Sequence, residues 1–100
     1  MDLKQPAMAG TLESSDIQVA VAPNPGGGIA IELDSPVKAQ FGDAILDTVR
    51  AVLAEFGVEE ARVQLLDQGA LDCVIRARMQ CAVCRAAQIS YDWSREDRRP

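Results

Sequence analysis

The chain has 100 residues, of which 48% are hydrophobic and 25% are charged, a balance typical of one small globular domain. Its formal net charge is −5, so it lacks the basic character that non-specific binding to nucleic acid or to an anionic membrane requires. Histidine is absent, which removes the usual general base near neutral pH and the commonest metal ligand. We therefore expect no nucleic-acid or membrane partner and no self-contained catalytic site.

The beginning of the chain and its cysteines indicate a cellular compartment. Residues 1–6 lack the basic and then apolar pattern of a signal peptide, and no apolar run approaches the length of a membrane span. Three cysteines are an odd number and do not make a disulfide framework. The sequence predicts a cytosolic protein with free thiols.

Two short strands are predicted in the first third of the chain. Residues 1–15 mix small and polar residues without apolar periodicity and predict a mobile arm, with order beginning near Asp16. Apolar residues then alternate over 17–22 and again over 29–34, with a Pro- and Gly-rich turn between them. We expect these two strands to pair as an antiparallel hairpin.

A helix is predicted next, with Ser35 as N-cap, Pro36 in the first turn and Gly57 as the C-cap. One helical face is formed by residues at three- and four-residue spacing, all but Thr48 apolar: Val37, Phe41, Ala44, Ile45, Thr48, Val49, Val52, Leu53 and Phe56.

The remaining elements are a strand within residues 58–67 and a second helix. The helical spacing of the latter is carried by Leu71, Val74, Ile75, Met79, Ala82, Val83 and Ala86, although residues 71–75 could open as a short strand. Residues 91–100 are almost without apolar side chains and predict a disordered tail. The expected fold is α+β, in the order ββαβα: a small, mainly antiparallel sheet of about three strands with two amphipathic helices on one face.

Three motifs could carry chemistry, and each has a simpler interpretation. Cys81 and Cys84 form a C-x-x-C, but the chain has no histidine to complete a set of four zinc ligands. On one helix, Cys73 would lie about 16 Å from Cys84 along the axis, too far to bind the same metal ion. Small apolar packing residues are the favoured interpretation of these cysteines.

Gly26–Gly28 resembles a phosphate loop, yet a strand follows, so a turn is favoured. Glu13 and Asp16 are expected to be a solvated carboxylate pair in the arm.

The arm itself holds the most informative residues. Ser14 lies among small residues, where a hydroxyl is accessible to a modifying enzyme. The segment Gly-Thr-Leu-Glu-Ser, residues 10–14, with Asp16 two positions later, resembles the N-terminal signature of the acyl carrier (gamma) subunit of citrate lyase. The similarity continues through QFGDAI (40–45), GALDCVIRAR (69–78) and Arg85-Ala86, and covers residues 1–90. Ser15 occupies a position that is often Gly in that family.

This resemblance implies a function. The modified serine of the family falls on Ser14, which would carry 2'-(5''-phosphoribosyl)-3'-dephospho-coenzyme A through a phosphodiester, with acetyl or citryl held as a thioester on the terminal thiol. Residues 16–90 would then be a non-catalytic acyl-carrier domain. No residue of the chain is assigned to catalysis or to a metal.

The resemblance also implies partners: the citrate lyase alpha and beta subunits, a prosthetic-group transferase, and an acetate ligase that acts on the prosthetic thiol. Two alternatives remain open. The carrier of citramalate lyase or malonate decarboxylase would share the prosthetic chemistry, whereas a scaffold or adaptor protein would carry no attached group.

Overall fold

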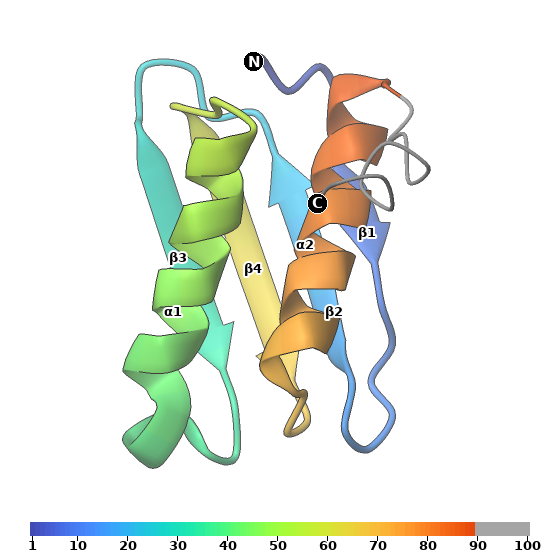
Figure 1. The fold of residues 1–100 in the computed structure, drawn as a ribbon. Coiled ribbons are helices and arrows are strands. Elements are labelled where there is room, and N and C mark those ends of the chain that lie inside the picture. The colour runs from blue at the N-terminus through green and yellow to red at the C-terminus, as the bar shows by residue number, and fades with distance from the viewer. Residues whose placement is uncertain (90–100) are drawn as a thin grey trace, which may run out of the picture.

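The computed structural model describes residues 1–89, which form a four-stranded mixed sheet with two helices on one face (Figure 1). The elements in chain order are β1 (Ala7–Ala9), β2 (Ile17–Ala22), β3 (Ile29–Asp34), α1 (Lys38–Glu55), β4 (Ala61–Asp67) and α2 (Asp72–Ala87). The α+β class and the helices on one face are as predicted, with one strand more than expected. The predicted tail, residues 91–100, lies outside the described residues.

The strand order β1-β2-β4-β3 shows that the predicted hairpin is wrong. β2 pairs antiparallel with β4, with Val19 opposite Leu65, whereas β3 pairs parallel with β4 on its other side. The reason lies in burial: Val63 and Leu65 of β4 are fully buried, but Ile31 of β3 is only half-buried. β4, whose inward-facing residues are the more deeply buried, takes the central place, and α1 provides the crossover that a parallel pair needs.

The first residues are also more ordered than predicted. β1 pairs antiparallel with β2, and Leu3 and Ala9 are buried in the core. The backbone N–H of Lys4 donates to the carbonyl of Ala86 at 2.8 Å, near the end of α2. The expectation that order begins near Asp16 is therefore wrong, because the three residues of β1 suffice to extend the sheet at its edge.

The core lies between the sheet and the two helices. Alternate residues of β2 and β4 point to it, while Val49, Val52 and Leu53 of α1 and Met79 and Val83 of α2 cover it. Each of these side chains contributes about 1.5–3 kcal/mol by leaving water.

The helix ends differ slightly from prediction. α1 begins at Lys38, and its N-cap is Val37 instead of the predicted Ser35. The Ser35 hydroxyl accepts a hydrogen bond from the N–H of Val37 at 3.2 Å, just before the helix. Gly57 follows the helix with φ of 66°, as the C-terminal glycine signal predicted. Residues 72–75 are helical, so the alternative of a short strand there is wrong.

Candidate functional site

Ser14 lies in the loop that joins β1 to β2, which we call the Ser14 loop (residues 10–16). Ser14 and Ser15 form a turn in which the N–H of Asp16 donates to the carbonyl of Glu13 at 3.1 Å. Both serines are exposed, and no side-chain hydrogen bond within residues 1–89 uses the Ser14 hydroxyl. The predicted attachment residue is therefore presented to solvent.

Asp16 anchors this loop to α2. Its carboxylate accepts hydrogen bonds from Arg78, with Nε to Oδ1 at 3.0 Å and Nη2 to Oδ2 at 2.8 Å. The Thr11 hydroxyl donates to Oδ2 at 2.6 Å, and the N–H of Ile17 donates to Oδ1 at 2.7 Å. The Asp16 side chain is only 13% exposed, so these four bonds replace most of its water.

The electrostatics of Asp16 follow from these partners. The bonds from Arg78, and after them the bond from Thr11, hold the pKa of Asp16 well below its usual range. The expectation of a solvated carboxylate pair with Glu13 is wrong for Asp16, which is buried and ion-paired. Local sequence patterns could not show this partner, because Arg78 lies 62 residues away from Asp16 along the chain.

Backbone geometry explains further residues of the loop. Gly10 has φ of +89°, and a Cβ atom there would lie 1.8 Å from the carbonyl oxygen of Ile17. Only glycine fits this position. Ser15 also has a left-handed φ, of 65°, and its N–H donates to the carbonyl of Gln68 at 2.8 Å. The Ser14 loop is thus bonded to the turn between β4 and α2.

A second buried carboxylate organises the same end of the sheet. Asp67, 1% exposed, accepts the hydroxyl of Ser35 at 2.7 Å and the N–H of Ala70 at 2.9 Å. It thereby joins the β3–α1 connection to the β4–α2 turn. We call this end, with its three connections, the serine end; Figure 1 shows the three connections together at the bottom of the molecule.

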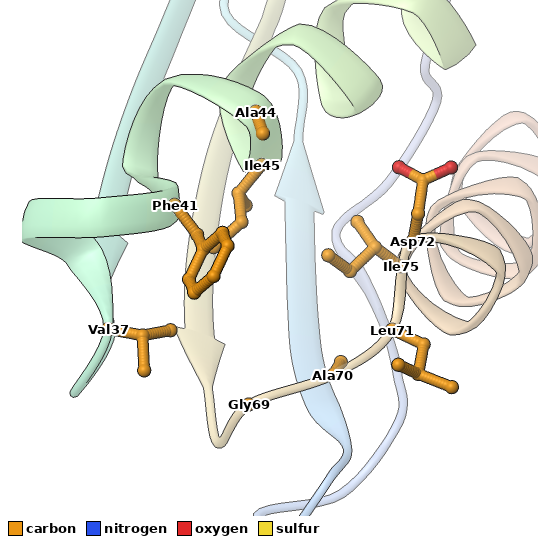
Figure 2. Close-up of a pocket in the computed structure, with 9 residues that line it drawn as sticks. All are labelled: Val37, Phe41, Ala44, Ile45, Gly69, Ala70, Leu71, Asp72 and Ile75. Carbon is orange, nitrogen blue, oxygen red and sulfur yellow. The ribbon is translucent and has the colours of Figure 1, made fainter.

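An apolar cleft of about 340 Å³ opens at the serine end between the first turns of α1 and α2 (Figure 2). Phe41 reaches toward it from α1, and Leu71 lies at its edge beside the start of α2. Their exposed fractions are 54% and 69%, so neither is covered by the core, although both belong to the helical spacing of apolar residues. The lining residues are Val37, Phe41, Ala44, Ile45, Gly69, Ala70, Leu71, Asp72 and Ile75.

The sequence does not predict this cleft, because helical spacing places Phe41 and Leu71 on apolar faces but does not show where two helices diverge. One hydrogen bond brings the Ser14 loop next to the wall of the cleft. Gln68, which accepts the N–H of Ser15, is followed directly by Gly69 of the cleft wall.

The cysteines of α2 do not gather into a metal site. Cys84 is buried, Cys81 is half-buried and Cys73 is exposed. Burial raises the pKa of the Cys84 thiol, which makes it a poor nucleophile. Within residues 1–89, no three His, Cys, Asp or Glu side chains are placed to hold a metal ion. Packing accounts for Cys84.

Comparison with known proteins decides the family. A family model described as the malonate decarboxylase delta subunit (MdcD) matches residues 4–86. The citrate lyase acyl carrier protein of Streptococcus equi subsp. equi is 49% identical over 98 residues, which cover 97% of this chain and 96% of that protein. The chain belongs to the citrate lyase acyl carrier protein family.

Other acyl carriers extend this finding. The citrate lyase acyl carrier protein of Klebsiella pneumoniae is 53% identical over 95 residues, covering 94% of this chain and 98% of that one. A chain in the crystal structure of a Pseudomonas malonate decarboxylase hetero-tetramer in complex with malonate has a TM-score of 0.68, at 20% identity. It is matched over 86% of this acyl carrier and 92% of its own length, and it shares the fold. Among the described residues of the carrier, no helix could cross a membrane.

Proposed function

We propose that this chain is the acyl carrier subunit of citrate lyase and that Ser14 is the residue that carries its prosthetic group. The observation that carries the proposal is an exposed serine on a loop that three other signature residues hold in shape. Gly10 allows the close approach to β2, and Thr11 and Asp16 close the loop with Arg78. The glycine, the threonine and the aspartate of the signature thus shape the loop, whereas the exposed serine side chain makes no hydrogen bond within the described residues.

The residues at this site fit a covalently attached group. Acyl carrier proteins of this family carry one, and we identify it as 2'-(5''-phosphoribosyl)-3'-dephospho-coenzyme A, from the resemblance of residues 10–16. A phosphodiester requires a serine oxygen that is accessible and not committed to another bond, and the Ser14 hydroxyl meets both conditions within the described residues. When attached, the group supplies a terminal thiol that holds acetyl or citryl as a thioester.

This chain's own contribution is to hold the attachment point. The Arg78–Asp16 pair and the Ser15–Gln68 bond fix the backbone on the C-terminal side of Ser14, while β1 fixes the N-terminal side. No residue of the carrier is needed for bond cleavage in this scheme. Catalysis would belong to the alpha and beta subunits, which would act on the acetyl or citryl thioester that the attached group supplies, with oxaloacetate as the product of cleavage.

The remaining partners are a prosthetic-group transferase and an acetate ligase that acts on the thiol. We place the carrier in the cytosol, a location that its three free cysteines support. A malonate decarboxylase carrier is the second candidate, because the family model and the Pseudomonas structure both point to it. Identity of 49% and 53% to citrate lyase carriers, against 20% to that structure, favours citrate lyase.

Ser14→Ala and the control Ser15→Gly test this proposal. The control removes the neighbouring hydroxyl and suits the left-handed backbone at that position. Each protein is incubated with the transferase and its donor, and intact mass and peptide mapping locate the adduct. We expect the adduct on the parent and on Ser15→Gly, and none on Ser14→Ala. An adduct on Ser15 refutes the assignment, and a parent without any adduct favours the scaffold alternative.

A further inference from the structure

The most exposed large apolar side chains of the described residues lie at the same end of the sheet as Ser14. Among the described residues, the three most exposed large hydrophobics are Leu71 at 69% and Leu12 and Phe41 at 54% each. All three lie at the serine end: Leu12 is two residues before Ser14, and the other two border the cleft. Single exposed apolar residues are ordinary on a protein surface, but a group of them around a cleft marks an interaction site.

The charges at this end are mainly negative. The exposed carboxylates are those of Glu13, Asp34 and Asp72, and Lys38 is an exposed cation beside them. Arg78, the other cation near the loop, is neutralised by Asp16. A partner surface with an apolar centre and a basic rim would complement this arrangement.

Resting on the proposed function of Ser14, we infer that the cleft, with Leu12, Phe41 and Leu71, is the docking surface for the protein that forms the phosphodiester at Ser14. In that step the Ser14 oxygen bonds to a phosphorus of an activated polyphosphate donor. The phosphorus–oxygen bond to the leaving phosphate group breaks, the electron pair leaves with that group, and the hydroxyl proton passes to a base of the partner.

Two arguments favour this partner over the lyase subunits. Bond formation at the Ser14 oxygen obliges the modifying protein to enclose the loop itself, whereas a protein acting on the distal thiol can remain at the far end of the attached group. A protein that binds a polyphosphate donor also carries cations around its active site, and these suit the carboxylates of the serine end. The structure therefore predicts an aliphatic or aromatic side chain of the modifying protein in the cleft.

Leu71→Ser is a sharp test because it should not weaken the fold. Leu71 is the N-cap of α2, has an extended backbone and makes no side-chain capping bond. Serine is a preferred N-cap residue, so the melting temperature should equal or exceed that of the parent. Phe41→Ser is the second variant. Met8→Ser is the matched control, since Met8 is 52% exposed but belongs to β1, away from the cleft.

The measurement is the rate of adduct formation against carrier concentration with the purified transferase, together with its binding to unmodified carrier. We expect KM and Kd to rise about tenfold for Leu71→Ser and Phe41→Ser, with kcat within about twofold, and no change for Met8→Ser. Equal KM for Leu71→Ser and the parent overturns the inference. Normal modification combined with weakened binding to the lyase subunits also overturns it and reassigns the surface. A parent that acquires no adduct refutes the proposed function itself.

Discussion

The bond between Arg78 and Asp16 offers the most informative perturbation of the Ser14 loop. Arg78→Met keeps an unbranched apolar stem but removes the positive charge and both donors, which lie 2.8 and 3.0 Å from the carboxylate. Asp16 would retain the bonds from Thr11 and from the N–H of Ile17. Its carboxylate, 13% exposed, would then lack a counter-ion.

The expected loss of stability follows from this geometry. Hydrogen bonds to charged groups contribute about 1.5–3 kcal/mol. The Arg78 side chain is 40% exposed, so solvent screens part of the attraction and the lower half of that range applies. We expect Arg78→Met to unfold about 2 kcal/mol more easily at pH 7. For a domain of this size the melting temperature falls by about 8–16 °C.

The same pair predicts a pH dependence. Because the folded-state pKa of Asp16 is lowered, its contribution to stability is fully present above the ordinary Asp pKa of about 4. It is lost as the pH falls toward the folded-state pKa, since the unfolded chain then takes up a proton that the folded chain does not. The difference in stability between parent and Arg78→Met should narrow progressively below about pH 4.

Urea unfolding at a series of pH values measures both effects. Arg76→Met is the control: Arg76 is on the same helix and pairs with Glu55, but both side chains are well exposed, so we expect a loss of about 0.2–1 kcal/mol. Equal losses for the two variants at pH 7 would contradict the anchoring role of Arg78. A difference between parent and Arg78→Met that stays constant from pH 7 to pH 2 would contradict the explanation by ion pairing.

Three further predictions concern the backbone and the thiols. Ser15→Gly should stabilise the protein by about 0.5 kcal/mol in thermal unfolding, because φ at this position is 65°; a loss of stability would count against the left-handed turn. Gly10→Ala should lower the free energy of unfolding by about 3 kcal/mol in urea, because its Cβ would lie 1.8 Å from a backbone oxygen. A loss below about 0.5 kcal/mol, as is usual for surface substitutions, would show that the loop has another conformation. Replacing Cys81 and Cys84 together by Ala should cost about 1–2 kcal/mol and leave adduct formation unchanged by intact mass, whereas loss of the adduct in the folded variant would assign the thiols a role.

Local patterns in the sequence predicted most of the elements. Alternation of apolar residues identified β2, β3 and β4, and helical spacing identified α1 and α2, because each pattern reflects burial of one face. The pairing of the strands was not predictable in this way. Alternation shows that β3 has an inner face, but whether it pairs with β2 or β4 depends on which strand fills the centre of the sheet.

In the candidate site, too, local sequence features were predictable and contacts between distant residues were not. Ser14 was recognised from the signature in its own segment, and its exposure agrees with the accessibility expected of it. The ion pair of Asp16 could not be predicted from local patterns, because Arg78 reaches Asp16 only through the packing of α2 against β1 and β2. β1 was missed because three residues are too few to establish an alternation.

The anchoring of the Ser14 loop has a geometric consequence for the lyase complex. If Ser14 carries the proposed group and is held at a fixed point by its neighbours, the terminal thiol of that group would move within a sphere centred on that point, with a radius equal to the extended length of the group. Both active sites that such a thiol would visit in the proposed complex would then have to open within this sphere while the carrier stays docked. A rigid base keeps that volume small, and the effective concentration of a tethered group rises as its tether shortens. The spacing of the two active sites in the assembled enzyme would therefore be set by the chemistry of the attached group, and not by the length of the polypeptide.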